Sequence, residues 1–317
     1  MKKPLIVLTG PTAVGKTDLS IALAKAVNGA IVSADSMQVY RHMDIGSAKI
    51  KQEEQQGVPH YLIDALEPWE EFHVVRFQEM AQAALEEIYA QGKLPIVTGG
   101  TGFYIQALLY SIDFTEEEQD PKYRRSLEQL AREKGASYLH GLLLLVDEKS
   151  ALEIHENNVK RVIRALEYHH LTGQKISEHN EAERKKESPY AFCYFVLNDH
   201  REKLYQRIEQ RVDQMLAEGL VEEVRSLKEM GCTREMVSMQ GLGYKEILDH
   251  LEGRQSLEEA IYLIKRDTRH FAKRQLTWFR RERDVIWLNK PDFGYDERSI
   301  LEFMEEKMGE RGIKICK

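Results

Sequence analysis

Cysteine is scarce in this chain: the 317 residues include only Cys193, Cys232 and Cys316, which stand far apart. They form neither the C-x-x-C spacing of a zinc or redox site nor a disulfide framework. No run approaches the roughly 18 apolar residues of a membrane-spanning helix, and the apolar segment of a signal peptide is missing at the N-terminus. We therefore expect a cytoplasmic protein with no membrane partner. We also expect a monomer.

The sequence also lacks a strong excess of one charge. The 45 Lys and Arg residues against 52 Asp and Glu give a net charge of −7, and 42% of the residues are hydrophobic. This composition is that of an ordinary globular protein and excludes a fibrous or disordered chain. It does not exclude a nucleic-acid partner, because a basic face can occur on an acidic chain.

Short apolar runs alternate with helical patterns over the first hundred residues. The expected strands are 4–9, 30–33, 61–63 and 94–98, and the expected helices are 17–27 and 77–89. Strands that alternate with helices in this way predict βαβ units and a parallel sheet. The fold class that follows is α/β.

Helical patterns predominate after about residue 112. The expected elements are an acidic loop at 115–119, a helix beginning at Asp120-Pro121, helices at 155–171, 204–230 and 256–280, and strands at 191–197 and 284–288. Proline favours the first position of a helix, which supports the start at Pro121. We predict a core domain formed by residues 1–112 and 191–317, with a mostly helical insertion domain at 113–190.

The strongest motif lies between the first strand and the first helix. It fits the phosphate-loop pattern G-x-x-x-x-G-K-[ST] with Gly10, Pro11, Thr12, Ala13, Val14, Gly15, Lys16 and Thr17. Its glycines let the backbone wrap an anion, and the helix N-terminus offers free N–H groups. Lys16 would reach the outer phosphate and Thr17 would hold Mg²⁺. The sheet is therefore expected to be P-loop NTPase-like.

A phosphate loop defines the ligand class and leaves four reactions open: a GTPase, a motor ATPase, a small-molecule kinase, or a transferase with a diphosphate leaving group. Asn289-Lys290-Pro291-Asp292 matches the N-K-x-D motif of GTPases. The chain has no D-x-x-G segment to sense a γ-phosphate, so we interpret N-K-P-D as a polar turn. Asp64 ends the short strand-like run 61–64, where a motor ATPase has an acidic residue that helps to bind the metal. Because the run is short, we interpret Asp64 as an ordinary residue at a strand end.

Three further features could complete the site, each with a simpler interpretation. Asp35 follows the second strand and is either a base or magnesium ligand, or only a helix N-cap. The segment 99–102, Gly-Gly-Thr-Gly, either binds an anion or forms a flexible turn. Arg207 and Arg211 share one helix face and either clamp a leaving phosphate or lie on a solvated surface.

A basic stripe lies near the C-terminus. Residues 265–283 contain eight Lys or Arg against two acidic residues, a local charge of +6 that leaves −13 on the rest of the chain. The cations recur at helical spacing (Arg266, Arg269, Lys273, Arg280), and apolar residues recur on another side (Ile261, Ile264, Phe271, Trp278). One packed face and one cationic face on the same helix indicate a polyanion ligand, and we favour nucleic acid.

Eight segments in order resemble the tRNA dimethylallyltransferase (tRNA isopentenyltransferase) family, bacterial type, over essentially the whole chain. They are GPTAVGKT (10–17), SADSMQVYRHMDIGSAK (33–49), VPHYLID (58–64), GGTGFY (99–104), KRVIRALE (160–167), RIEQRVDQML (207–216), GLGYKE (241–246) and KRQLTWFRR (273–281). Gly241 stands where the family often has alanine, and residues 155–158 read H-E-N-N where H-P-N-D is common. The zinc finger of some eukaryotic relatives is not expected here.

The resemblance implies a reaction. A dimethylallyl group moves from dimethylallyl diphosphate to the exocyclic N6 amine of the tRNA adenine 3′-adjacent to the anticodon, position 37, and diphosphate leaves. Asp35 matches the general base, and Lys16, Thr17, Thr101 and Arg211 match positions that bind the diphosphate, with Mg²⁺ at Thr17. The adenine must be flipped out of its stack to react.

The resemblance also implies the residues that contact tRNA. They are Asp35, Ser36, Met37, Gln38, Thr101, Arg124, Lys160, Arg161, Arg164, Gln240, Gly243, Lys245, Lys273, Arg274, Gln275, Trp278 and Arg280. The helical insertion would grip the anticodon stem-loop. The main alternative is a P-loop small-molecule kinase with a helical lid, and a third is a non-catalytic RNA-binding protein that keeps a nucleotide.

Overall fold

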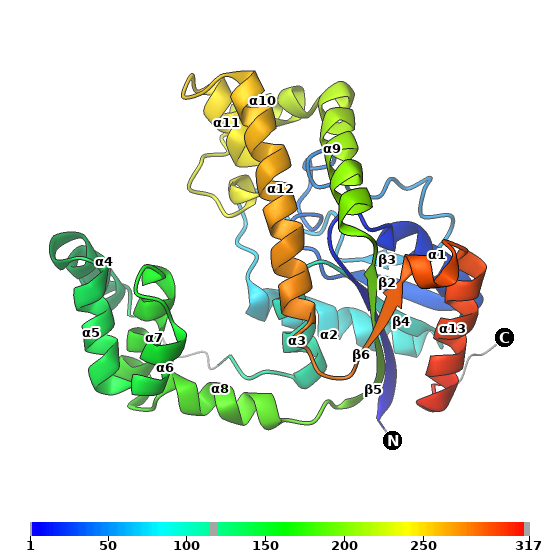
Figure 1. Cartoon of the computed structure of the whole chain (residues 1–317), viewed down its shortest axis with the longest axis horizontal. Helices are drawn as coiled ribbons and strands as arrows, with labels where there is room; N and C mark the ends of the chain where they lie inside the picture. The colour runs from blue at the N-terminus through cyan, green and yellow to red at the C-terminus, as the bar shows by residue number, and fades with distance from the viewer. Residues whose placement is uncertain (1, 115–119, 314–317) are drawn as a thin grey trace. The chain divides into compact units, whose positions relative to one another are not determined.

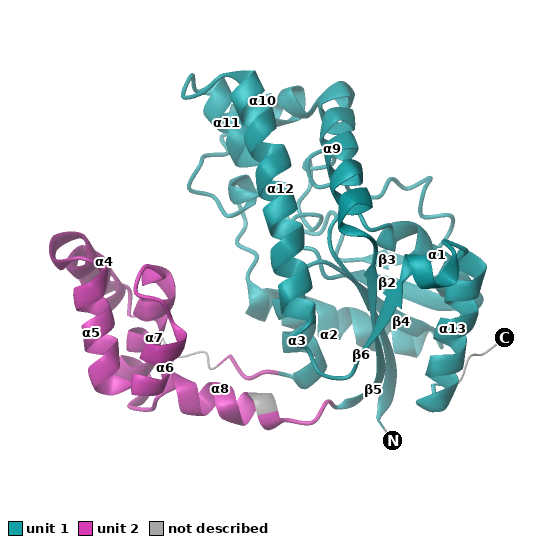
Figure 2. Ribbon diagram, viewed as in Figure 1, with its two compact units in different colours: residues 1–111, 189–317 teal, residues 112–188 magenta. Residues whose placement is uncertain are grey.

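A computed structural model describes residues 2–114 and 120–313, so the predicted acidic loop at 115–119 and Cys316 lie outside the described residues. The chain divides into two compact units, residues 1–111 with 189–317, and residues 112–188 (Figure 2). The boundaries expected from the sequence differ from these by one and two residues. No helix of the described residues is long and apolar enough to cross a bilayer.

Within the described residues, unit 1 contains a parallel sheet of six strands (Figure 1). Its order is β3-β2-β4-β1-β5-β6, and the strands are β1 (Lys3–Thr9), β2 (Gly29–Ser33), β3 (His60–Tyr61), β4 (Leu94–Gly99), β5 (Tyr190–Asn198) and β6 (Val285–Asn289). All five strand pairs are parallel. The α/β fold class predicted from the sequence is confirmed.

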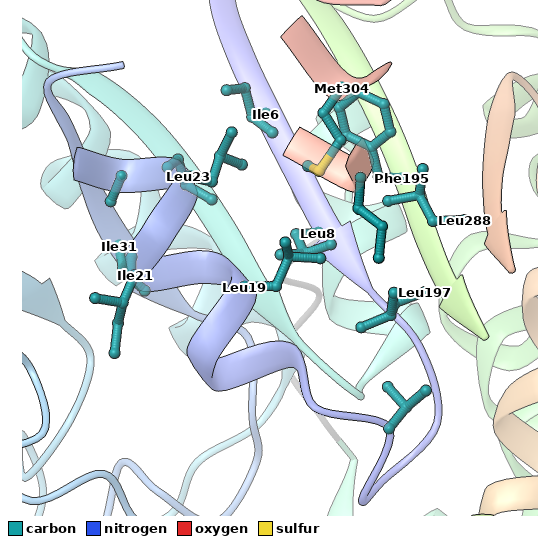
Figure 3. Packing of buried hydrophobic residues seen from close by; sticks show 14 of the residues in the cluster. Ile6, Leu8, Leu19, Ile21, Leu23, Ile31, Phe195, Leu197, Leu288 and Met304 are labelled. Carbon is teal, nitrogen blue, oxygen red and sulfur yellow. The ribbon is translucent and has the colours of Figure 1, made fainter. Parts of the chain in front are cut away.

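Helices cover the sheet because its central strands are apolar on both faces. Ile6 and Leu8 of β1 pack in one cluster with residues of α1 (Lys16–Ala26) and α13 (Glu297–Glu310), such as Leu23 and Met304 (Figure 3). Side chains alternate between faces along a strand, so Leu5 and Val7 point the other way and are also fully buried. On that side α2 (Val74–Ala90) contacts β2 and β4, and α3 (Gly102–Tyr110) contacts α2.

The remaining helices of unit 1 follow β5. They are α9 (Arg201–Glu218), α10 (Leu220–Glu229), the short helix η1 (Ser238–Gln240), α11 (Tyr244–Leu251), α12 (Leu257–Phe279) and, after β6, η2 (Lys290–Phe293). The long helices α9 and α12 lie side by side, as Figure 1 shows and their contacts confirm. Both bring residues to the carboxyl ends of the strands, where parallel sheets bind ligands.

Unit 2 consists of helices in its described residues. They are α4 (Pro121–Lys134), α5 (Ala136–Val146), α6 (Glu148–Glu153), α7 (Val159–Thr172) and α8 (Ile176–Lys185). Leu139, Leu143 and Val162 centre its separate core. The buried Asp147 carboxylate caps α6 through Ser150 and also accepts hydrogen bonds from Ser177 of α8. Burial raises the pKa of Asp147, but these hydrogen bonds outweigh it and leave the pKa lowered.

Several expected elements differ in extent. The helix expected at 204–230 is two helices, because Gly219 adopts a left-handed conformation between α9 and α10. The strand expected at 61–63 covers only His60–Tyr61, since Leu62 has φ +61° and leaves the extended region. The helix expected from residue 155 begins at Val159. Helices α3, α5, α6, α8, α11 and α13 were not predicted as separate elements.

Candidate active site

The phosphate loop joins β1 to α1, as its motif predicts. Gly10 has φ +148°, and a Cβ there would lie 2.3 Å from the Leu197 carbonyl oxygen of β5. Gly15 has φ +94° and stands directly before α1. A side chain at Gly10 would therefore separate the loop from β5. Both glycines have positive φ, which lets the chain turn from β1 into α1.

A cavity of about 1090 Å³ opens in unit 1 beside this loop. It gathers most of the residues predicted for the site, from separate segments of the chain. Those that line it are Thr12, Ala13, Gly15, Lys16, Thr17, Asp35, Ser36, Met37, Gln38, Thr101, Arg211, Gln240, Gly243, Lys245 and Arg274. Gly10, Val14, Lys273, Gln275, Trp278 and Arg280 do not line it. The sequence thus predicted a set of residues that the fold brings together around one space.

Lys16 is partly buried and lines this cavity. Its ammonium donates hydrogen bonds to the carbonyl oxygens of Gly10, at 3.0 Å, and Pro11, at 2.9 Å. Burial lowers the pKa of Lys16 to about 8, the Asp35 carboxylate opposes that shift, and the Arg211 guanidinium adds to it. A diphosphate would offer this ammonium anionic acceptors in place of two carbonyls.

Asp35 follows β2 at the edge of the sheet. One carboxylate oxygen accepts hydrogen bonds from the backbone N–H groups of Met37, at 2.8 Å, and Gln38, at 3.4 Å. The carboxylate therefore orders its own turn, although no helix begins there, so the N-cap interpretation is wrong. Asp35 lines the cavity and is close enough to Lys16 to perturb its pKa.

The glycine-rich loop after β4 lies against the loop that carries Asp35. A Cβ on Gly99 would meet the Ala34 carbonyl oxygen at 2.3 Å. The Thr101 N–H donates to the same oxygen at 3.3 Å, and the Ala34 N–H donates to the Thr98 carbonyl oxygen at 2.7 Å. Only glycine permits this contact, and it places Thr101 and Asp35 on adjacent parts of the cavity wall. The segment is therefore not a simple flexible turn.

Arg207 and Arg211 lie one turn apart on α9 and have different environments. Arg207 forms an ion pair of 2.8 Å with Asp199, whose side chain is fully buried. Arg211 instead lines the cavity, and the surrounding protein lowers its pKa through loss of hydration. Only Arg211 is therefore placed to meet an anion in the cavity. The clamp interpretation therefore fits Arg211 alone, and the solvated-surface interpretation does not describe Arg207, which is paired with a buried carboxylate.

Helix α9 also supplies an apolar wall of the cavity, which was not predicted from the sequence. Ile208, Val212 and Met215 of α9 line the cavity together with Ile50 and Ala48 from the loop after β2. Their spacing of three and four residues is the signal that could have revealed this apolar stripe. An apolar wall beside an anion site suits a ligand with a hydrocarbon group next to phosphates.

Lys290 was interpreted as part of a polar turn, yet it contacts the phosphate loop. Its ammonium donates to the Val14 carbonyl oxygen at 3.0 Å, and Asn289 donates to Asp292 at 3.0 Å within the turn. Burial lowers the pKa of Lys290, and Arg207 lowers it further. The N-K-P-D segment therefore stabilises the phosphate loop through the hydrogen bond from Lys290 to Val14.

The basic stripe of α12 is partly neutralised within unit 1. Arg269 pairs with Glu209 at 2.6 Å, and Lys265 pairs with Asp213 at 2.6 Å, both on α9. Arg266 pairs with Asp267 beside it. Among the described residues, Lys273, Arg274 and Arg280 form no ion pair and are exposed. The available cationic face is therefore the C-terminal part of the stripe.

Two residues of this segment point inward. Gln275 is 5% exposed and hydrogen-bonds the backbone of two loops. Trp278 packs over Gly102, where a Cβ would meet the indole ring at 2.3 Å, and lies edge-on to Phe103. The packed side of α12 consists of Ala260, Ile264, Ala272, Gln275 and Phe279, which only partly matches the predicted set.

Gln240 of η1 and the residues that follow it also line the cavity. A Cβ on Gly241 would lie 2.5 Å from the methyl carbon of Met37. The Met37 thioether thus occupies space that an alanine at 241 would need. Gln240 donates a hydrogen bond to the Arg234 carbonyl oxygen, and Lys245 pairs with Glu246 at 3.2 Å. Gly243 has φ +93° and precedes α11.

Unit 2 carries four of the residues predicted to contact tRNA. Arg124 of α4 pairs with Glu167 of α7 at 3.1 Å and with Glu128 at 3.5 Å. Lys160, Arg161 and Arg164 are exposed on α7. Arg124 therefore contributes to packing between α4 and α7, while the three α7 cations are open to solvent.

The cavity has few oxygen donors near Thr17 that could bind Mg²⁺. Thr17 is open to the cavity, and Ser33 and Asp35 line the same space. No cluster of three or more His, Cys, Asp or Glu that could hold a metal occurs in residues 2–114 and 120–313. Mg²⁺ keeps several waters and binds through few protein oxygens plus substrate phosphates, so these residues fit an ion that arrives with a diphosphate.

The low pKa of Lys16 predicts a pH-dependent affinity for inorganic diphosphate with Mg²⁺. Bound anions would raise the Lys16 pKa above its free value of about 8, so binding takes up a proton. The affinity should therefore fall as pH rises through about 8, by up to about tenfold per pH unit. Titration calorimetry measures this. Lys16→Arg, always charged, should remove the dependence, and an equal slope in that variant would contradict the assignment.

Comparison with known proteins gives concordant results. The family model described as IPP transferase matches residues 38–282, and one described as isopentenyl transferase matches residues 3–67. A tRNA dimethylallyltransferase of Lachnoclostridium phytofermentans is 62% identical over 98% of this chain and 99% of its own length. That of Acetivibrio thermocellus is 53% identical over 93% and 95%.

Solved structures agree. A tRNA isopentenylpyrophosphate transferase from Bacillus halodurans is 44% identical, covers 98% of both chains and has a TM-score of 0.74. A eukaryotic dimethylallyltransferase acting on tRNA is 30% identical, with a TM-score of 0.82 over 99% of this chain and 81% of that one. With family models and relatives spanning almost all of its length, this chain belongs to the tRNA dimethylallyltransferase family, enzymes that prenylate tRNA.

Proposed function

We propose that this chain transfers a dimethylallyl group from dimethylallyl diphosphate to the N6 amine of the adenine at position 37 of tRNA. The observation that carries the proposal is that Lys16, Asp35, Thr101 and Arg211 line one cavity with an apolar wall. The cations Lys16 and Arg211 can bind the diphosphate, and the apolar wall can contact the dimethylallyl group. The carboxylate of Asp35 can accept a proton from the amine. The relatives' names point to the same chemistry.

The diphosphate end of the substrate would bind at the α1 N-terminus. Backbone N–H groups of the phosphate loop and the ammonium of Lys16 meet its oxygens, and Arg211 and Thr101 approach from other walls. Mg²⁺, held by Thr17 and the substrate, would add positive charge that favours departure of the diphosphate. The dimethylallyl group would lie along Ile208, Val212 and Met215 of α9.

The transfer step needs only the two substrates and the Asp35 carboxylate. The bond between C1 of the dimethylallyl group and the diphosphate oxygen breaks, and its electron pair leaves with the diphosphate. The N6 lone pair of adenine forms the new bond to C1, and Asp35 accepts the proton that N6 loses. Lys16 and Arg211 stabilise the charge that develops on the leaving oxygen. The adenine has to leave its stack to reach Asp35.

The tRNA would lie along the C-terminal part of α12. Lys273, Arg274 and Arg280 supply charge for the phosphates, and Arg274 also lines the cavity. In unit 2, Lys160, Arg161 and Arg164 offer a second cationic surface on α7, which we assign to the anticodon stem-loop. Phosphate contacts of this kind set affinity and orientation, whereas the cavity selects the base.

Nucleoside analysis tests the proposal. The protein is incubated with Mg²⁺, dimethylallyl diphosphate and unmodified tRNA, and the tRNA is then digested and analysed by mass spectrometry. We expect one adenosine, at position 37, to gain the dimethylallyl group. A matched tRNA with guanosine at position 37 should stay unmodified. Modification of that control, or at several adenosines, would contradict the proposed base choice.

Charge reversal on α12 should weaken tRNA binding. The double variant Lys273→Glu and Arg274→Glu removes two cations that neutralise phosphates, so binding should weaken and the slope of log K against log salt should fall by about two. Fluorescence anisotropy at several salt concentrations measures both. Arg298→Glu, on the exposed face of α13, is the matched control and should bind as the wild type does. A double variant with the wild-type salt slope would count against this surface.

A further inference from the structure

Gln275 differs from its neighbours in the basic segment of α12. Lys273 and Arg274 are exposed, whereas Gln275 is 5% exposed and lies on the packed side of the helix. A buried amide has to satisfy both its donor and its acceptor. Where those hydrogen bonds go therefore decides what the residue does.

Both ends of the amide bind the backbone of the active site. The Gln275 side-chain oxygen accepts a hydrogen bond from the Thr12 N–H of the phosphate loop at 2.9 Å. Its NH₂ group donates to the Gly100 carbonyl oxygen, also at 2.9 Å. A Cβ on Gly100 would lie 2.2 Å from that nitrogen, so glycine at position 100 makes room for the amide.

The two loops that Gln275 joins carry the reacting groups. Thr12 lies beside Gly10 and Pro11, whose carbonyls receive the Lys16 ammonium. Gly100 precedes Thr101, and the Thr101 N–H donates to the Ala34 carbonyl, one residue before Asp35. One side chain of α12 thus fixes the spacing between the loop of Lys16 and the loops of Thr101 and Asp35.

We propose that Gln275 is a positioning residue that links the cationic helix α12 to the diphosphate site, rather than a residue that contacts tRNA. The inference rests on the proposed function, because it assigns the phosphate loop to a diphosphate. Helix α12 presents Lys273 and Arg274 outward and Gln275 inward within three residues. A helix arranged in this way joins the tRNA face and the leaving-group site through one rigid element.

Binding of inorganic diphosphate with Mg²⁺ in the absence of tRNA tests this directly. Gln275→Met keeps the length of the side chain and removes both hydrogen bonds. Losing two ordinary hydrogen bonds should weaken diphosphate binding by about tenfold and raise the KM for dimethylallyl diphosphate. The affinity for tRNA should stay unchanged. Gln91→Met, an exposed amide at the end of α2, is the matched control and should behave as the wild type does.

A second variant keeps the test informative if Gln275→Met is poorly folded. Gly100→Ala leaves Gln275 in place but drives its NH₂ group away from the loop. It should weaken diphosphate binding in the same direction. Because both changes break one bridge, the double variant should lose less than the product of the two single effects. Fully independent effects would overturn the proposal.

The remaining outcomes are also decisive. If Gln275→Met binds diphosphate as the wild type does but binds tRNA more weakly, Gln275 contacts tRNA and the proposal is wrong. If the wild-type protein itself does not bind diphosphate, the proposed function fails and this inference falls with it. The binding measurement needs no turnover, so it separates these two failures.

Discussion

Asp35→Asn is expected to lower the rate of transfer in a single turnover by roughly 10² to 10⁴-fold, the range that general-base catalysis contributes. Asparagine keeps an oxygen that can accept the N–H hydrogen bonds of Met37 and Gln38, so the turn should persist. What it loses is the ability to accept the proton of N6. Rapid-quench measurement with labelled dimethylallyl diphosphate gives the rate.

Two controls accompany this variant. Binding of tRNA, measured by filter retention, should stay within about twofold of wild type, because the substituted amide still orders the same turn. Asp284→Asn is the control, because Asp284 does not line the cavity. Its backbone has φ +61°, a conformation that asparagine tolerates well, so this variant should keep full activity. Near-normal turnover in Asp35→Asn would show that another group accepts the proton.

Arg211→Met is expected to lower single-turnover transfer by roughly 10² to 10³-fold, the usual cost of removing one group that stabilises developing negative charge. Methionine preserves much of the side-chain volume on α9 without the charge. The fold should be retained, because Arg211 lines an open cavity, whereas Arg207 holds the buried Asp199. Arg201→Met, exposed on the first turn of the same helix, is the matched control and should transfer normally.

The same variant has a second readout. Arg211 is one of the groups that lower the pKa of Lys16 to about 8. Its removal should shift the loss of diphosphate binding to higher pH while weakening binding at neutral pH. If diphosphate binding weakens but is still lost at the same alkaline pH as in the wild type, Arg211 does not influence the charge of Lys16. Unchanged transfer would remove Arg211 from the site.

The sequence predicted those parts of the molecule that are governed by local patterns. Apolar runs such as 4–9 and 94–98 became central parallel strands, and the glycines of the phosphate loop match the positive φ at Gly10 and Gly15. Helices α3 and α13 were missed. Helix α3 follows directly on the glycine-rich loop, and α13 is mostly charged, with Ile300, Met304 and Met308 as its buried face.

Side-chain partners were not accessible from spacing alone. Arg207 and Arg211 have equivalent sequence positions, yet Asp199, which follows β5, decides that only Arg207 is paired. Arg269 and Lys265 belong to the basic stripe by sequence but pair with α9. Gln275 lies among cations and nonetheless points inward, because the loops it binds come together only in the folded sheet. Tertiary contacts decide each of these cases.

The most direct test of the account uses two labelled substrates in parallel. Purified protein, Mg²⁺ and unmodified tRNA are incubated with labelled dimethylallyl diphosphate in one reaction and with labelled ATP in another. We predict that label enters the tRNA in the first reaction, with release of diphosphate, and that no phosphate is released from ATP in the second. Release of phosphate from ATP without label in tRNA would contradict the account and favour a phosphate-loop kinase.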